Sequence, residues 1–540
     1  MSINNCTNLE VDIAKLREDF FQQQNDQIPD PSVIAAMANV YFPEFGHGEK
    51  SVPLENGVPT VDFINAIPVA IEEELRKESP AISQEQSQPF DFLGEVRPIF
   101  TECENTADKH RNIASNEMIE RDTTIDFGMG IYPEVCMQSS PIDVQAIRKD
   151  FPILEEQVNG KSLIWFDNAA TTQKPKCVIE RLAYFYQHEN SNIHRAAHTL
   201  AARATDAYEE ARDKVKMFLH AASSKEIVFV RGATEAINLV AQSLGKYQLQ
   251  KDDEIIVSML EHHANIVPWQ MLCLETGARL RVIPVDESGQ ILLPAYEKLL
   301  NAKTKIVAVA HVSNALGTVT PVKEIVKMAH QYGAKVLIDG AQAVSHMQVD
   351  VQELDCDFYA FSGHKIYGPT GIGVLYGKSE ILSAMHPYQG GGNMIADVTF
   401  EKTLYRESPS RFEAGTGNIA DAVGLSAALD YVLSIGMDRI HRYEHDLISY
   451  SMHALQCVPK LRLIGTAEDK AGVISFVIDG LTATDIGKAL SEEGIAVRAG
   501  HHCAQPILRR FGLEATVRAS LAFYNTRKEV DALVAVLCKL

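Results

Sequence analysis

The chain has 540 residues, 46% of them hydrophobic, and carries a formal net charge of −21. This length allows two or more domains, at roughly 100–200 residues each. The negative charge argues against general binding to nucleic acid or to an anionic membrane surface, because both are negatively charged themselves.

The nine cysteines form no CxxC pair and show no regular spacing. This pattern disfavours a disulfide framework or a zinc ribbon and is typical of a reducing cytoplasm. The first residues, MSINNCTNLEVDIAKLREDF, contain no basic patch followed by an apolar stretch. No run in the chain reaches the roughly 18 apolar residues of a membrane span. We therefore expect a cytoplasmic protein without a signal peptide or a membrane span.

Residues 1–137 differ in composition from the rest of the chain. They contain 25 acidic and 9 basic side chains, against 46 and 41 in the remaining 403 residues. Polar stretches such as FFQQQNDQIPDPS and KESPAISQEQSQPFDF cannot bury enough apolar surface to offset the entropy lost on ordering. Short apolar segments at 33–45, 61–75 and 89–100 interrupt them. The region is either a disordered tail with local structure or a string of segments that order on a partner, and the apolar spacing favours the second.

Residues 138–431 alternate between strand-like and helix-like runs. The strand-like runs include EIVFVRG, DEIIVSML, RLRVIPVD, KIVAVAHVSN, AKVLIDG and GIGVLYG. Continuous β-branched strands between amphipathic helices predict an α/β domain whose mainly parallel sheet is covered on both faces. In residues 432–540, helices and short strands such as GVISFVID and GIAVRAG predict a smaller α+β domain.

The first candidate site is RGATEAINL, residues 231–239. Gly232, Ala233 and Thr234 lead into a predicted helix, so backbone N–H groups and a hydroxyl would face an anion such as a phosphate. An ordinary helix start shows the same Thr-x-x-Asn pattern, and this motif alone leaves both interpretations open. The chain contains no GxxxxGK[ST] sequence, which excludes a nucleotide P-loop.

Two more candidates follow predicted strands. His262 and His263 come after DEIIVSML. Because adjacent residues of a strand point to opposite faces, one histidine against a flat ligand is favoured over a zinc ion bound by both. Asp339 ends the strand VLID, and Gln342 follows three residues later. A buried carboxylate needs a partner, here magnesium, a basic side chain or a protonated heterocyclic nitrogen, unless it simply caps the next turn.

The sequence FSGHKIYGPTGIGVLYG, residues 361–377, places Ser362, His364 and Lys365 directly after the predicted strand DFYAF. The glycines that follow allow a ligand to approach the backbone closely. In isolation Lys365 would be interpreted as a surface charge. An aspartate and a Ser-x-His-Lys set after successive apolar strands change this interpretation. They provide what pyridoxal phosphate needs, namely a lysine for its aldehyde, a carboxylate for its ring nitrogen and donors for its phosphate.

These motifs resemble those of the fold-type I pyridoxal-phosphate enzymes of the class V aminotransferase family, and within it the SufS-type (group II) cysteine desulfurases. The resemblance runs from about Val144 to Leu540. It is carried by FDNAATTQKP, NIHRAAHTL, GATEAINLVA, EHHANIVPWQ, VSNALGT, IDGAQA, FSGHKIYGPTGIGVLYG, FEAGTGN, VRAGHHCAQP and RASLAFYNT. It implies a large domain with a mainly parallel seven-stranded sheet and a small α+β domain that carries the catalytic cysteine.

The resemblance also implies roles for single residues. Catalysis would depend on Cys503, Lys365 and His262. Pyridoxal 5′-phosphate would be held by Lys365, Asp339, Gln342, His262, Thr234, Ala233, Ser362 and His364, and by Thr416 from a second subunit. The substrate L-cysteine would be bound by Arg518, Asn314, His194 and Arg498, and no metal ion is expected. In FEAGTGN the chain has Gly417 where the family often has proline, which departs from the pattern beside Thr416.

Cys503 in isolation, in a loop rich in glycine and histidine, would be interpreted as a packing residue. By the resemblance it is the nucleophile that takes sulfur from L-cysteine as a persulfide and releases L-alanine, and His501 and His502 are expected to favour its thiolate form. The resemblance further implies a homodimer, a SufE/SufU-like sulfur-acceptor protein and a selenocysteine lyase side activity. The alternatives are a class V aminotransferase, which would not need Cys503, and a non-catalytic assembly scaffold.

Residues 1–137 precede the region of this resemblance. Their acidic composition and the motifs DPSVIAAMANVYFPE and PFDFLGE are similar to the cargo-loading segment of cysteine desulfurases packed in family 2 encapsulin shells. We therefore expect an enzyme in an encapsulin nanocompartment of the cytoplasm, whose sulfur goes to storage or to iron–sulfur assembly. A docking arm for the sulfur acceptor and a solubilising tail are the alternatives.

Overall fold

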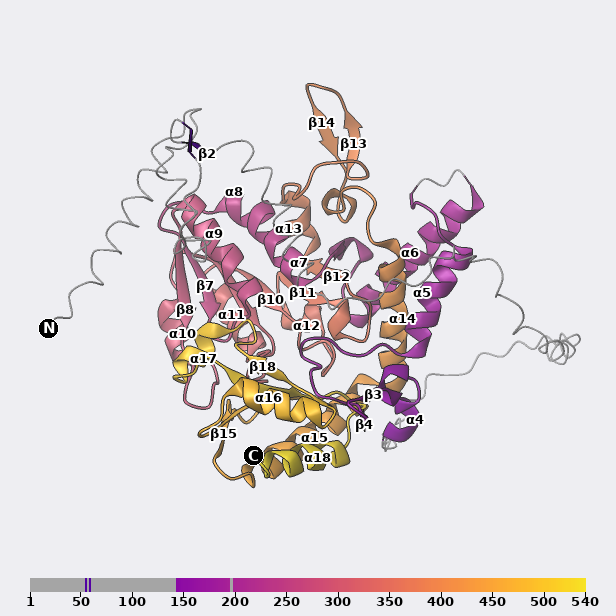
Figure 1. The fold of residues 1–540 in the computed structure, drawn as a ribbon. Coiled ribbons are helices and arrows are strands. Elements are labelled where there is room, and N and C mark those ends of the chain that lie inside the picture. Colours follow the sequence, from indigo (N-terminus) through magenta and orange to yellow (C-terminus); the bar gives the residue numbers. More distant parts are fainter. Residues whose placement is uncertain (1–53, 56–57, 60–141, 195–197) are drawn as a thin grey trace, which may run out of the picture. The chain divides into compact units, whose positions relative to one another are not determined.

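The computed structural model describes residues 54–55, 58–59, 142–194 and 198–540. The chain divides into two compact units, Met1–Gly130 and Ile131–Leu540. In the first unit the described residues form a short antiparallel pair, β1 (Leu54–Glu55) and β2 (Val58–Pro59). The apolar segments noted at 33–45, 61–75 and 89–100 lie outside the described residues. All other described elements belong to the second unit (Figure 1).

A seven-stranded sheet with the order β6-β12-β11-β10-β9-β7-β8 forms the centre of the second unit. Every neighbouring pair is parallel except the two pairs of β12, which runs antiparallel to β6 and β11. The predicted seven-stranded, mainly parallel sheet is thus confirmed. Its strands are β6 (Ile227–Val230), β7 (Glu254–Ser258), β8 (Arg279–Ile283), β9 (Thr304–Ala310), β10 (Lys335–Asp339), β11 (Phe358–Ser362) and β12 (Gly373–Gly377).

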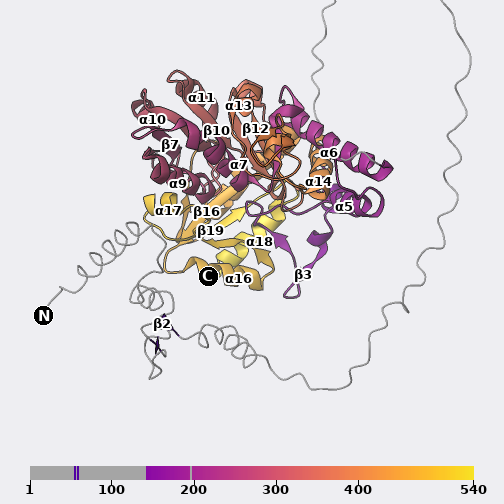
Figure 2. The same ribbon diagram turned by 90° about the horizontal axis from the view of Figure 1, so that it is seen from above.

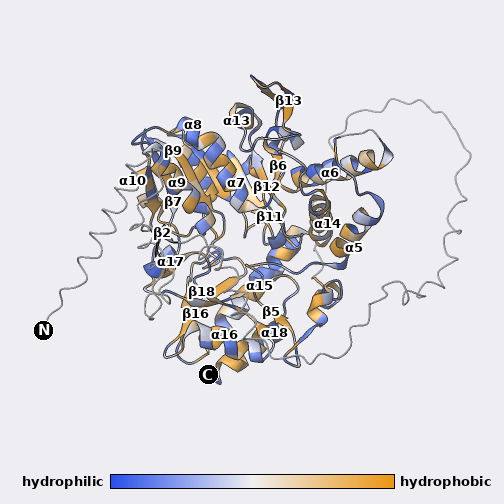
Figure 3. Ribbon diagram, turned by 45° about the horizontal axis from the view of Figure 1, so that its top comes forward, coloured by the Kyte–Doolittle hydropathy of each residue, from blue (hydrophilic) through white to orange (hydrophobic). Residues whose placement is uncertain are grey.

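Side chains alternate along these strands between two apolar cores. In β6, Ile227 and Phe229 belong to one core, whereas Val228 and Val230 belong to the other. Because both faces are buried, the strands read as continuous apolar runs rather than alternating ones, and hydrophobic residues gather on the sheet in Figure 3. The first core includes α5 (Lys176–His188), α6 (Thr199–Phe218), α10 (Leu293–Leu299), α11 (Val322–His330), α12 (Val351–Leu354) and α14 (Ile419–Ile435); the second includes α7 (Ala233–Val240), α9 (Val267–Thr276) and α13 (Ser379–Ala384).

The C-terminal part contains a four-stranded antiparallel sheet with the order β15-β16-β19-β18. Most of its buried apolar residues form a core of their own, whereas Ile440, Ile464 and Ile507 pack into the first core of the large sheet. In Figure 1 it lies below the seven-stranded sheet, in yellow and orange. The elements are β15 (Leu461–Ile464), β16 (Val473–Ile478), β18 (Arg498–Gly500), β19 (Thr516–Ser520), α15 (Met437–Gln456), α16 (Ala483–Glu492), α17 (Gln505–Arg510) and α18 (Arg527–Leu537).

Several short helices and strands lie outside these two sheets. A parallel pair of β5 (Ile164–Trp165) and β17 (Ile495–Ala496) joins the beginning of the second unit to the C-terminal part. The hairpin of β13 (Ile395–Val398) and β14 (Thr403–Tyr405) projects from the body in Figure 1. The remaining described α-helices and strands are α4 (Val144–Arg148), β3 (Gln157–Val158), β4 (Lys161–Ser162) and α8 (Lys246–Gln248).

The expected boundary at residue 432 falls within α14, which packs against α5 and α6 in both views (Figures 1 and 2). The next helix, α15, begins at Met437. The division into 138–431 and 432–540 stays a prediction. Within the part of the chain that the structure describes, no single helix has the length and hydropathy of a membrane span; α14 and α15 meet these criteria only together, as a pair bent by 74°.

Candidate active site

A cavity of about 210 Å³ opens where β9, β10 and β11 end, facing the antiparallel sheet of the C-terminal part. This is where open α/β sheets bind their ligands. Twelve of the fourteen predicted site residues line it: Ala233, Thr234, His262, Asn314, Asp339, Gln342, Ser362, His364, Lys365, Arg498, Cys503 and Arg518. Their individual roles stay predictions, but the structure brings them into one place.

Lys365 lies in a 3-10 turn, Gly363–Lys365, directly after β11. Two contacts hold this turn in place. β12 returns antiparallel to β11, and the Gly363 N–H donates to the Ile372 carbonyl at 2.9 Å. Burial lowers the pKa of Lys365, while the charge of Asp339 opposes that shift. A lowered pKa leaves more of the amine neutral, and the neutral amine is the form that reacts with an aldehyde.

Asp339 is the last residue of β10 and is buried. Burial raises the pKa of its carboxyl group, with Lys365 opposing. Its Oδ1 accepts the Ala341 N–H at 3.0 Å, so it does cap the next turn. Gln342 donates through Nε2 to the Ala169 carbonyl at 2.8 Å. Asp339 is therefore placed to pair with a protonated ring nitrogen, and Gln342 is bonded to Ala169, which lines the same cavity.

His262 presents a neutral imidazole to the cavity. Burial, with a further contribution from Lys365, lowers the pKa of His262 to about 3. Its Nδ1 accepts the Ala264 N–H at 3.0 Å. The proton of the neutral ring must then sit on Nε2. The arrangement gives the site a proton donor at a defined atom.

His263 takes a different environment from its neighbour. Both histidines lie beyond the end of β7, with His263 in a turn at His263–Asn265 and His262 directly before it. Strand alternation therefore does not apply to them, and it was the wrong reason for expecting only one of them to face a ligand. Instead, the His263 ring stacks on His501 with centroids 5.8 Å apart, and its Nε2 accepts the Gln505 N–H at 3.4 Å. In the described residues no three His, Cys, Asp or Glu side chains gather in a way that could hold a metal ion.

The start of α7 and the end of β11 together form a cradle for an anion. Gly232 precedes the helix, and the Ala233 N–H donates to the Ser362 hydroxyl oxygen at 2.9 Å. The Ser362 hydroxyl proton is therefore free to point into the cavity, beside Thr234. Burial lowers the pKa of His364 to about 4, which makes its ring neutral. Hydroxyl and backbone donors at a helix N-terminus suit a phosphate group.

Arg518 lines the cavity from β19 with a buried guanidinium group. Its Nη1 donates to the Asn314 carbonyl at 3.1 Å and its Nη2 to Oδ1 of Asp167 at 2.9 Å. Its Nε is buried without a partner, and so is Oδ1 of Asn314. Buried polar atoms without partners are costly, so both atoms mark the place of a polar ligand. The residues present thus fit the predicted cofactor and an amino-acid substrate.

Asp167 contacts two of the residues that line the cavity, and the sequence analysis assigned it no role. It lies in the motif FDNAATTQKP, two residues after the end of β5. Its Oδ2 is 3.9 Å from Nη1 of Arg498, so one carboxylate faces two arginines. The sequence signal that could have found it is a carboxylate just beyond a short apolar strand.

Cys503 lies half-buried in the same cavity, in a constrained loop. Both His502 and Cys503 have left-handed backbone angles, with φ of 53° and 54°. The Cys503 N–H donates to Nδ1 of His501 at 3.0 Å, and the Cys503 carbonyl accepts the His263 N–H at 2.8 Å. Burial lowers the pKa of His502 to about 3, so its ring is neutral, and its support of a thiolate at Cys503 stays a prediction.

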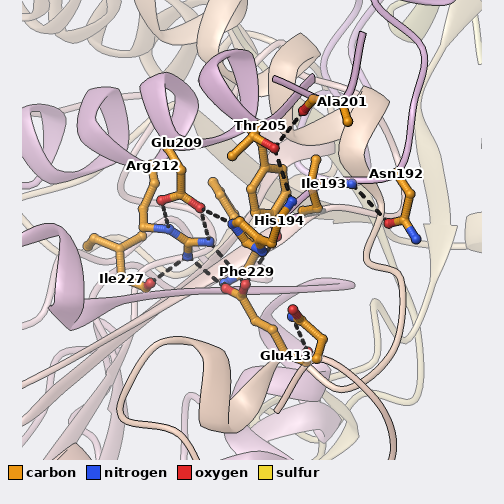
Figure 4. Close-up of polar contacts among 12 residues, drawn as sticks. Asn192, Ile193, His194, Ala201, Thr205, Glu209, Arg212, Ile227, Phe229 and Glu413 are labelled. Carbon is orange, nitrogen blue, oxygen red and sulfur yellow. Dashed lines mark hydrogen bonds and ion pairs between the residues drawn. The ribbon is translucent and has the colours of Figure 1, made fainter. Parts of the chain in front are cut away.

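Two predicted residues lie outside this cavity. His194 belongs to a polar group around Arg212, where its Nε2 is 2.9 Å from Oε1 of Glu209 (Figure 4). Thr416 lines a second cavity of about 290 Å³, together with Glu413 and other residues. The roles that the resemblance implies for His194 and Thr416 stay predictions.

Comparisons with known proteins agree with this geometry. The pattern of the family described as "Aminotransferase class-V" matches residues 164–533. A cysteine desulfurase from Synechococcus elongatus is 67% identical over 395 residues, which are 73% of this chain and 63% of that protein. A probable cysteine desulfurase from Mycolicibacterium paratuberculosis is 64% identical over 74% of this chain and 58% of its own length. The chain thus spans less than two thirds of these relatives.

Other relatives are covered almost completely. A cysteine desulfurase from Dickeya dadantii is 54% identical over 398 residues, covering 74% of this chain and 96% of that protein. Among solved structures, apo cysteine desulfurase from Thermococcus onnurineus NA1 superimposes with a TM-score of 0.70 at 40% identity, over 73% of this chain and 97% of its own. The cysteine desulfurase CsdA from Escherichia coli gives a TM-score of 0.69 at 41% identity, over 74% and 98%. The α/β fold-type I architecture is thereby confirmed.

Proposed function

Because the chain belongs to the class V aminotransferase family, we propose that it is a pyridoxal-phosphate-dependent cysteine desulfurase that converts L-cysteine to L-alanine. The observation that carries this proposal is the position of Cys503 in one cavity with Lys365 and Arg518. A transaminase needs the lysine and the arginine but has no use for the cysteine. Relatives that are 54–67% identical are named cysteine desulfurases, which supports the same activity.

Pyridoxal phosphate would be held by Lys365, Asp339, Gln342, the Thr234–Ser362 cradle and His262. When bound, it supplies an electron sink for the bonds at the substrate Cα. Arg518 would orient the substrate, with its free Nε as a donor to the carboxylate. His262 would act as the proton donor through Nε2.

Cys503 would carry out the sulfur transfer. Its thiolate attacks the substrate sulfur, so that a sulfur–sulfur bond forms while the carbon–sulfur bond breaks. The electron pair of the broken bond stays with the substrate carbon, which takes up a proton. The net reaction converts L-cysteine and the Cys503 thiol into L-alanine and a Cys503 persulfide, with no external oxidant or reductant.

The experiment measures alanine and persulfide from L-cysteine in wild type and in Cys503→Ser, and records the cofactor absorbance of both. We expect the variant to keep its cofactor and to form no persulfide. Cys538→Ser, at an exposed cysteine, is the matched control and should behave as wild type. Equal rates in wild type and Cys503→Ser would refute the proposal and favour the aminotransferase alternative. Absence of cofactor absorbance in wild type would favour the scaffold alternative.

We further propose a SufS-type (group II) enzyme that works as a homodimer and passes its persulfide to a SufE/SufU-like acceptor protein. In support, α17 begins at Gln505, only two residues after Cys503, so the cysteine loop is short. Such an acceptor should raise the rate of alanine formation severalfold, and no stimulation would argue against this subgroup. Selenocysteine in place of cysteine tests the lyase side activity.

For residues 1–137 we propose a cargo-loading function in an encapsulin shell, within the cytoplasm. The support is their acidic composition and short apolar motifs. Deletion of 1–137 should abolish co-purification with the shell protein and leave the turnover of L-cysteine unchanged. If turnover is lost as well, the region serves the enzyme itself rather than targeting.

A further inference from the structure

In the part of the chain that the structure describes, Asp167 is the one acidic side chain paired with both arginines of the cavity. Its Oδ1 is 2.9 Å from Nη2 of Arg518, and its Oδ2 is 3.9 Å from Nη1 of Arg498. Arg518 is 2% exposed, whereas the Arg498 side chain is 44% exposed and lines the open part of the cavity. The three side chains together carry one net positive charge.

We propose that Asp167 sets the specificity of this site for amino acids that carry a single carboxylate. This inference rests on the proposed function and deepens it. By binding Nη2 of Arg518, Asp167 leaves Nε as the free donor for the α-carboxylate of the substrate. By facing Arg498, it offsets the charge that would otherwise attract a second carboxylate on the substrate side chain.

The charge count gives the physical reason. Without Asp167, two guanidinium groups would share one cavity, and a dicarboxylic amino acid would match their charge better than a monocarboxylic one. With Asp167 in place, the two ion pairs already use part of the guanidinium charge, so the side-chain carboxylate of such a ligand gains less from Arg498. The uncharged thiol side chain of cysteine does not depend on that charge.

The position of Asp167 does not depend on its own carboxylate. Its neighbours are tied to the end of β19, the strand that carries Arg518. The Ser520 N–H donates to the Phe166 carbonyl at 2.7 Å, and Nδ2 of Asn168 donates to the Ser520 carbonyl at 2.7 Å. Asp167→Asn should therefore keep the local backbone and an acceptor for Nη2 while it removes the charge.

The test is the binding of L-alanine and L-aspartate to the holoenzyme, followed by calorimetry or by the change in cofactor absorbance. Neither ligand needs sulfur chemistry, so a wrong desulfurase assignment would show in the Cys503→Ser experiment and not here. In Asp167→Asn we expect the affinity for aspartate to rise about tenfold relative to that for alanine. A tenfold change is small compared with the Coulomb energy of two unit charges a few ångströms apart inside a protein. An unchanged ratio, or an equal loss of both ligands, would overturn the proposal.

Two further variants keep the test decisive. The double variant Asp167→Asn/Arg498→Gln restores the net charge and should return the ratio to its wild-type value. Arg498→Gln alone should lower the affinity for aspartate relative to that for alanine. This variant tests the proposal even if Asp167→Asn does not fold. If Arg498→Gln leaves the ratio unchanged, the charge count is not the determinant. Glu493→Gln, which breaks the exposed pair with Lys161, is the matched control and should change nothing.

Discussion

Arg212 and Glu413 form a bidentate ion pair in the interior of the protein. Nη1 is 2.7 Å from Oε1 and Nη2 is 3.0 Å from Oε2, and the side chains are 2% and 6% exposed. The other guanidinium N–H groups donate to Glu209 and to the Ile227 carbonyl (Figure 4). The pair ties α6 and β6 to the segment that carries Thr416, and the charges of its carboxylate neighbours raise the pKa of Arg212 against the effect of burial.

Glu413→Gln should lower the free energy of unfolding by about 3–5 kcal/mol, because the guanidinium would stay buried without its main counter-charge. Urea denaturation of the holoenzyme measures this. Glu514→Gln, which breaks the exposed pair with Arg509, should leave the unfolding midpoint unchanged. A loss below about 1 kcal/mol in Glu413→Gln would show that the remaining contacts of Arg212 suffice.

Lys470 should make stability depend on pH. It is buried, it donates to the carbonyls of Leu316 and Gly465, and burial lowers its pKa to about 7 from the ordinary 10.5. Between pH 7 and 10 the unfolded chain binds more protons than the folded one, so this group adds stability as pH rises, by at most about 1.4 kcal/mol per pH unit.

The measurement is the unfolding free energy of wild type minus that of Lys470→Met, at pH 7 and pH 9. We expect this difference to move in favour of wild type at the higher pH. Lys528→Met, an exposed position of α18, controls for general effects of lost charge. A difference that stays constant over this range would contradict the lowered pKa.

Gly373→Ala should weaken cofactor binding. A Cβ at Gly373 would lie 2.4 Å from the Cα of Gly232 and 2.6 Å from the Phe361 carbonyl oxygen, both of them backbone atoms. Relief of this clash requires β12 to move away from the start of α7, where the phosphate cradle begins, at a cost of about 1–3 kcal/mol. Cofactor retention after dialysis measures the effect. Gly390→Ala, where no atom lies within 4 Å, should retain the cofactor, and equal retention in both variants would refute the prediction.

His262→Gln should keep the cofactor and slow alanine formation by about 10²–10⁴-fold, because glutamine cannot carry the proton that His262 holds at Nε2. Single-turnover measurement of alanine separates this from binding. His263→Gln is the matched control, since its ring faces His501 and the Gln505 N–H, and it should lose much less. A loss below about tenfold in His262→Gln would remove His262 from the proton transfer.

Residues that directly follow a strand could be placed from the sequence. Asp339 ends β10, Lys365 lies three residues beyond β11, and Thr234 lies in the first turn of the helix after β6. Because parallel strands end at the same edge of a sheet, the order of apolar runs was enough to bring these residues together. The same argument does not give orientation, which is why β12, an equally apolar run, could not be recognised as the antiparallel strand.

Contacts between distant segments could not be predicted in this way. Arg518 and Asp167 are 351 residues apart, and Arg212 and Glu413 are 201 apart. Such pairs leave no periodicity in the sequence, because each depends on how segments far apart in the chain pack together in the folded protein. The pKa of His502 could not be predicted for the same reason, since burial is a property of the folded chain.

The separation of Arg518 from Asp167 has a consequence for biosynthesis. The ribosome makes the chain from its N-terminus, and domains fold as units while synthesis proceeds. The seven-stranded sheet is complete once β12 has formed at Gly377, with Lys365 already in its turn. The C-terminal segments that carry Cys503 and Arg518 are synthesised only after more than a hundred further residues. A nascent chain can therefore have Lys365 in its turn long before the cavity is complete, and any ligand that needs Arg518 must wait for the last strand, β19.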